Sequence, residues 1–178
     1  MAASLDPWLP DYQVCSLQRR ASSADPDTLW EAAGLVRVDD TRVLRPLIGA
    51  RLGPHAPSAQ TTFRELFRSG IFTLLEEGDH YSISGIAGCL WSPRGDYARF
   101  ESAADYKEYE PPNRAKGAVL TQVREHERGS EIVTEIRVWC TDRGAWMRFR
   151  PVWTIVAPFM RFVRMDLLRQ VTKRAEAG

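Results

Sequence analysis

Apolar residues in the last third of the chain recur every three or four positions. They form the stripe Trp146, Phe149, Trp153, Val156, Met160, Val163, Leu167 and Val171. At about 3.6 residues per turn these side chains share one face, which predicts a long amphipathic C-terminal helix after Thr141-Asp142. Pro158 removes one backbone hydrogen bond, so we expect a kink or break near Ala157. The apolar stripe of such a helix needs an apolar surface to cover.

The apolar period changes to two in the middle of the chain, which is typical of strands. Strands are predicted at 12–18, 71–76, 81–87, 97–101, 115–125 and 132–140. Turn residues separate the later strands, so we expect an antiparallel sheet. Gly85 and Gly88 lie in one of these strands and indicate a bend that lets the sheet curl.

Short helices are predicted between the first strand and the others. Asp25-Pro26-Asp27 favours a helix start, and this helix ends near Gly34. A second helix is expected over 43–52, and Thr62 with Glu65 predicts a capping box for a third. Prolines in residues 1–11 favour an extended N-terminal arm, followed by a single domain over 12–176.

Composition narrows the class of protein. The 178 residues fit one domain, and 44% hydrophobic with 26% charged residues is ordinary for a folded chain. A net charge of +1 argues against a nucleic-acid binder. The longest nearly apolar run, 152–160, is too short for a transmembrane segment, and residues 1–12 hold no apolar signal region. Cys15, Cys89 and Cys140 lack paired spacing and are expected as buried or half-buried thiols of a cytoplasmic protein.

Charge is distributed unevenly along the chain. From Arg143 onward, eight basic residues face two acidic ones, so the C-terminal helix is basic and the rest mildly acidic. One interpretation is a solvated face whose cations suit a helix C-terminus. The other is contact with anionic lipid, an acidic partner or a second copy of the chain. Ile155 and Phe162 fall off the apolar stripe, so they pack against the N-terminal arm or form such a contact.

No motif of catalysis or metal binding is present in the sequence. His55, His80 and His126 are scattered singly, and neither a nucleophile elbow nor a phosphate-binding glycine pattern occurs. We therefore expect no metal and no cofactor. Whether the protein is an enzyme stays open at this point.

Glu135 and Arg137 are two residues apart on a predicted strand and therefore share one face of the sheet. Ile136 and Val138 point to the opposite face, which we take as the core side. The favoured interpretation is a solvated or cross-strand pair on the outer face. If the faces are inverted, the pair is buried in the interior and becomes a candidate for acid–base chemistry or ligand anchoring.

The order of these elements resembles the α+β helix-grip fold of the START-like superfamily, also called SRPBCC. This superfamily includes Bet v 1-like proteins, polyketide cyclase/dehydrase relatives and lipid-binding relatives. The resemblance is carried by Gly85-Ile86-Ala87-Gly88-Cys89-Leu90-Trp91, by Arg114-Ala115-Lys116, and by residues from Thr134 to Glu176, where the chain is similar to small bacterial members. It implies a curved antiparallel sheet around the long C-terminal helix, with two or three short helices.

The resemblance also implies a deep apolar cavity between the sheet and the C-terminal helix. We expect its lining to include Trp146, Phe149, Trp153 and Met160 from the helix and Trp91 and Phe100 from the sheet. Arg164 lies at the edge of the stripe, where it either extends to solvent or anchors a ligand carboxylate or phosphate.

Three functions fit this expectation. The leading one is binding, with transport or sequestration, of a hydrophobic small molecule such as a lipid, isoprenoid or polyketide. The second is a polyketide cyclase/dehydrase-like enzyme that uses polar cavity groups such as Tyr81, Tyr97 or Arg164. The third is a non-catalytic protein- or membrane-interaction module with a filled core, because aromatic stripes form solid cores as readily as cavities.

Overall fold

The computed structural model describes residues 3–40, 58, 60–68, 70–92 and 96–178. The helix predicted over 43–52 lies outside the described residues. In chain order the elements are β1 (Val14–Ser22), α1 (Pro26–Leu35), a 3₁₀ turn (Val38–Asp40), α3 (Phe63–Leu66), β2 (Thr73–Gly78), β3 (Tyr81–Gly88), α4 (Ala103–Glu108), β4 (Ala115–His126), β5 (Gly129–Cys140) and α5 (Arg143–Ala175).

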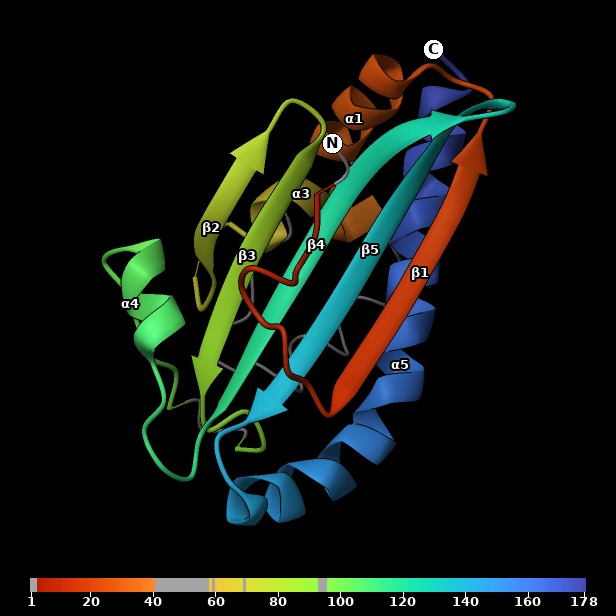
Figure 1. The fold of residues 1–178 in the computed structure, drawn as a ribbon. Coiled ribbons are helices and arrows are strands. Elements are labelled where there is room, and N and C mark those ends of the chain that lie inside the picture. The colour runs from red at the N-terminus through yellow and green to blue at the C-terminus, as the bar shows by residue number, and fades with distance from the viewer. Residues whose placement is uncertain (1–2, 41–57, 59, 69, 93–95) are drawn as a thin grey trace.

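The five strands form one antiparallel sheet in the order β1-β5-β4-β3-β2 (Figure 1). β4 and β5 form a long hairpin, and β1 pairs with the free side of β5, with Val14 opposite Val138. Helices α5, α1 and α3 lie behind the sheet in this view, while the N-terminal arm crosses its front. The predicted α+β helix-grip arrangement is therefore confirmed.

Side-chain caps start the helices where the sequence predicts. The Asp25 carboxylate accepts a hydrogen bond from Thr28 N at 2.9 Å and caps α1. Thr62 and Glu65 form the predicted capping box of α3. The Asp142 carboxylate accepts from Ala145 N at 2.8 Å at the start of α5. Each cap satisfies amide groups that the first turn of a helix leaves unpaired.

Alternation along the strands separates two apolar clusters, one on each face of the sheet. The cluster on the inner face joins the sheet to α1, α3 and α5, and includes Leu29, Phe63, Val119, Ile136, Phe149 and Leu167. The cluster on the outer face joins the sheet to the arm and α4, and includes Leu5, Leu9, Ile83, Tyr106 and Leu120. The sheet is thus covered on both sides.

The prediction of a strand over 97–101 is wrong. Tyr97 makes only an isolated bridge to Gly88, and Ala98 N donates to Ala87 O at 2.9 Å. The chain then leaves the sheet and forms α4, which the strand pattern did not predict. The signal for α4 is a capping box in which the Ser102 hydroxyl accepts from Asp105 N at 3.1 Å.

Helix α5 runs without interruption from Arg143 to Ala175, so the predicted break near Ala157 is absent. Pro151 and Pro158 lie within the helix, and the ribbon bends between its lighter blue first turns and its darker C-terminal half (Figure 1). Each proline costs a backbone hydrogen bond. Apolar contacts of α5 with the inner cluster on both sides of Pro158 hold the helix together across it.

The N-terminal arm is not extended throughout. Trp8 N and Leu9 N both donate to Leu5 O, at 3.0 and 2.8 Å, and close a turn. This turn places Leu5 and Leu9 against the outer face of the sheet, where both are buried. Burial of the two leucines therefore favours a folded segment over the extended one that the prolines predict.

Candidate functional site

An apolar cavity of about 270 Å³ lies between the inner face of the sheet and α5. This volume approaches the lower end of ligand pockets, about 300 Å³. The helix contributes Phe149, Val152, Trp153, Val156, Phe159, Met160, Val163, Arg164 and Leu167. The strands contribute Ile86, Gly117, Val119, Ile136 and Val138, and the remaining wall is Leu66, Phe67, Ile71, Phe72, Leu90 and Tyr97.

The structure brings four of the seven predicted lining residues together at this cavity, and these are Phe149, Trp153, Met160 and Arg164. Trp91 and Trp146 pack against the inner cluster outside the lining. Phe100 lies on the opposite face of the sheet, with its ring 5.5 Å from that of Tyr106. The reason is that residues 97–101 leave the sheet instead of forming a strand.

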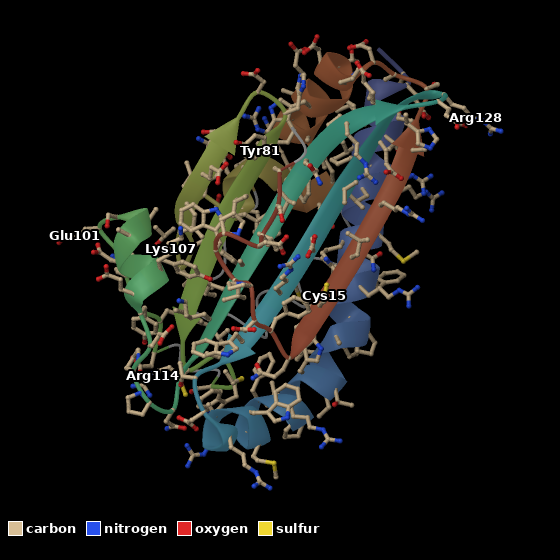
Figure 2. The ribbon with its side chains drawn as sticks, in the orientation of Figure 1. Cys15, Tyr81, Glu101, Lys107, Arg114 and Arg128 are labelled. Carbon is tan, nitrogen blue, oxygen red and sulfur yellow. The ribbon has the colours of Figure 1, made fainter. Side chains whose placement is uncertain are left out.

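Of the three polar groups suggested for a cyclase-like enzyme, Tyr97 and Arg164 line the cavity. Tyr81 does not. It projects from β3 on the face turned away from α5 (Figure 2), and its hydroxyl donates to Glu76 at 2.8 Å. Strand alternation determines this outcome, because Tyr81 shares its face with Ile83 and Ala87 of the outer cluster.

The sheet wall of the cavity was not identified from the sequence. Ile136 and Val138 were expected on the core side, and alternation in β4 gives Val119 the same side. The pattern therefore indicates the correct face, but it does not reveal which core positions border open space. At Gly117 no side chain is present, and a Cβ there would lie 3.0 Å from Cγ2 of Ile86. The missing side chain at Gly117 therefore leaves space for the cavity at this point of the sheet.

Among the described lining residues, Arg164 is the one with a charged side chain, and it is only 2% exposed. Its guanidinium donates to Ser16 O at 3.0 Å and to the Ser16 hydroxyl. Its Nε has no hydrogen-bond partner, and no acidic side chain in the described residues forms an ion pair with it. Burial lowers the pKa of Arg164 to about 10, so the group is still cationic at neutral pH. A desolvated positive charge therefore forms part of an apolar wall.

Glu135 and Arg137 lie on the outer face of the sheet, as the favoured interpretation of the sequence has it. Arg137 donates to Glu135 at 2.6 Å, and to Asp6 at 2.6 Å and Leu9 O at 3.2 Å in the arm. The arm covers Arg137, which is buried, whereas Glu135 beside it is partly exposed. The hydrogen bond from Arg137 lowers the pKa of the Asp6 carboxyl. The contacts of this cluster tie the arm to the sheet.

The three cysteines differ in burial. Cys140 is buried and Cys89 is half-buried, as expected, but Cys15 is exposed on β1 (Figure 2), which corrects the prediction for that residue. β1 is an edge strand, and Cys15 points to its outer side, where its Sγ lies 3.8 Å from Glu135 Oε1. The arm leaves this part of the edge uncovered.

The side of α5 that faces away from the sheet carries exposed apolar residues. Ile155 is 68% exposed and Phe162 is 54% exposed, so neither packs against the arm. Exposed arginines of the same helix include Arg148, Arg161 and Arg169. None of the helices in the described part of the chain contains an apolar stretch of the length that a membrane span requires.

In comparison with known proteins, no family model and no curated protein matches the chain. Solved structures match at low identity. Protein CV1439 from Chromobacterium violaceum is 12% identical, with 91% of this chain and 96% of that chain covered and a TM-score of 0.40. Ara h 8.0201 is 12% identical, with 93% and 99% covered and a TM-score of 0.37. CalU16 from Micromonospora echinospora is 15% identical, with 92% and 83% covered and a TM-score of 0.30.

The fold itself rests on the order and pairing of the elements in this chain. β1 is followed by short helices, then by four antiparallel strands, and finally by α5 packed on the inner face of the sheet. The chain has the helix-grip fold that its resemblance to the START-like superfamily implies.

Proposed function

We propose that the protein binds a hydrophobic small molecule in the cavity between the sheet and α5. The observation that carries this proposal is the apolar cavity of about 270 Å³, whose walls come from three separate parts of the fold. An apolar ligand that enters such a space loses contact with water and gains contacts with every wall. The class of ligand follows from the described lining residues, whose side chains are apolar except for the guanidinium of Arg164 and the phenol of Tyr97.

Filling the cavity with a larger side chain should abolish ligand uptake. Val156 of α5 lines the cavity, whereas its neighbour Ile155 points to solvent. In Val156→Trp the indole occupies ligand space, and saturable binding of the neutral fluorophore N-phenyl-1-naphthylamine should be lost. In the matched control Ile155→Trp the same indole is added outside, so binding should stay at the wild-type level.

The readout is a fluorescence titration of the folded proteins, with circular dichroism to show that each variant keeps its secondary structure. Absence of saturable binding by the wild-type protein would contradict the proposed function. Equal binding by both tryptophan variants would place the probe outside this cavity.

A second candidate role uses the outer side of α5 as a membrane contact. Apolar side chains at Ile155, Phe159 and Phe162 are exposed beside exposed arginines on the same helix. Such a combination inserts apolar groups at the lipid interface while its cations meet anionic headgroups. Contact through this helix would place the cavity, whose lining includes Phe159, next to the lipid.

Phe162→Glu should weaken this membrane contact. Phe162 is exposed and lies outside the cavity lining, so the substitution adds a negative charge without changing the ligand space. In flotation with vesicles that contain anionic lipid at low salt, we expect the wild-type protein to float and Phe162→Glu to stay in the dense fraction. A wild-type protein that fails to float would exclude this role, and dimer formation in sizing experiments would assign the surface to a second copy instead.

A further inference from the structure

Three buried polar atoms of the described residues lack a hydrogen-bond partner, and all three lie on the inner side of the sheet. They are Ser84 Oγ, Thr134 Oγ1 and Arg164 Nε. Ser84 and Thr134 are each 1% exposed, and Arg164 is 2% exposed. Ser84 pairs with the cavity residue Val119, and Thr134 is two residues from Ile136, which pairs with Ser16. The apolar side of the sheet therefore also carries unpaired polar groups.

Arg164 is the most costly of these groups because it is charged. A cation that is removed from water without a counter-ion loses hydration that two bonds to Ser16 replace only in part. The two hydrogen bonds to Ser16 leave the Nε–H of the guanidinium without a partner. Arg164 is also one of the lining residues, so it borders the space that a ligand would occupy.

We propose that the ligand is an apolar molecule that carries one carboxylate, and that Arg164 pairs with this carboxylate inside the cavity. This inference rests on the proposed function and specifies its ligand. The planar guanidinium matches the two oxygens of a carboxylate. One negative charge on the ligand also balances the one positive charge that the described lining residues carry, whereas a neutral molecule leaves Arg164 without a counter-ion.

A phosphate monoester fits this site less well. It carries a charge of about −1.5 to −2 at neutral pH. Arg164 offers a single positive charge, and the described residues of the lining include no second cation. The excess negative charge would then be buried among aliphatic side chains at a large desolvation cost.

The experiment compares two ligands with the same tail, dodecanoate and 1-dodecanol, by displacement of N-phenyl-1-naphthylamine at pH 8. Wild-type protein should bind dodecanoate about 10- to 100-fold more tightly than dodecanol, as expected for a charge-assisted contact in a buried site. Arg164→Met should lose this preference and retain its affinity for dodecanol. The matched control Arg161→Met removes an exposed arginine of the same helix and should keep the wild-type preference.

Arg164→Lys provides a second variant in case Arg164→Met does not fold, and it should lose part of the preference because the planar fork is absent. Equal wild-type affinities for dodecanoate and dodecanol would overturn the carboxylate assignment while leaving the proposed function intact. The same holds if Arg164→Met keeps the preference, or if dodecyl phosphate binds wild-type protein more tightly than dodecanoate. Failure of dodecanol, dodecanoate and the fluorophore alike to bind would overturn the proposed function itself.

Discussion

Phe149→Ala should lower the free energy of unfolding by about 3–5 kcal/mol, the range for truncating a buried aromatic side chain. Phe149 is buried in the inner cluster and lines the cavity. Its ring stacks on Trp153 at 5.7 Å and lies 6.3 Å from the ring of Trp146. Because Phe149 borders the existing cavity, truncation of its side chain enlarges that cavity, and neighbouring side chains cannot fill the added space.

Urea unfolding followed by circular dichroism measures this loss. Met147→Ala is the matched control, since Met147 lies two residues earlier on α5, is exposed, and should change the free energy of unfolding by less than about 0.5 kcal/mol. A loss at Phe149 as small as the one at Met147 would contradict the packing of the first half of α5 on the sheet.

Arg164→Met is expected to raise the free energy of unfolding of the ligand-free protein by about 1–3 kcal/mol, within the range for replacing buried charges with apolar groups. Methionine has a similar length and removes the desolvated charge. The variant loses the hydrogen bonds to Ser16, but Ser16 is only half-buried on the edge strand β1, so water can replace them. Stability gained at the expense of ligand selectivity is a common pattern in binding sites.

This second prediction is checked by urea unfolding with and without dodecanoate. Without ligand, Arg164→Met should be more stable than both wild type and the exposed control Arg161→Met. With dodecanoate, the wild-type protein should gain more stability, because at the same ligand concentration a tighter ligand stabilises the folded state more, by an amount that rises with the logarithm of its affinity. A ligand-free Arg164→Met that unfolds more easily than wild type would show that the Ser16 contacts outweigh the cost of the buried charge.

Local features of the fold could be predicted from the sequence because short segments determine them. The apolar stripe of α5, the alternation in β4 and β5, and the Thr62 capping box each depend on residues within one or two turns or strand repeats. The strand expected at 97–101 depended on more than local pattern. A strand at 97–101 would need a neighbouring strand to pair with along its length, but Tyr97 pairs with Gly88 through an isolated bridge.

The candidate site was predicted in part for the same reason. Phe149, Trp153 and Met160 follow from the helical period, and Arg164 follows from its place at the stripe edge. Phe100 was misplaced because its face depends on whether the chain stays in the sheet. The missed sheet residues were on the expected core face, but a filled core and an open cavity give the same alternation.

The spacing of apolar residues was enough to predict the class of fold and the apolar character of both surfaces that meet at α5, because periodicity follows from backbone geometry. The packing of the whole chain sets where those surfaces fail to touch and thus leave a cavity. It also decided that Arg164 turns inward to Ser16, while Arg137 bonds to the arm on the opposite face. Both outcomes depend on groups more than a hundred residues apart in the chain, and no local pattern encodes such contacts.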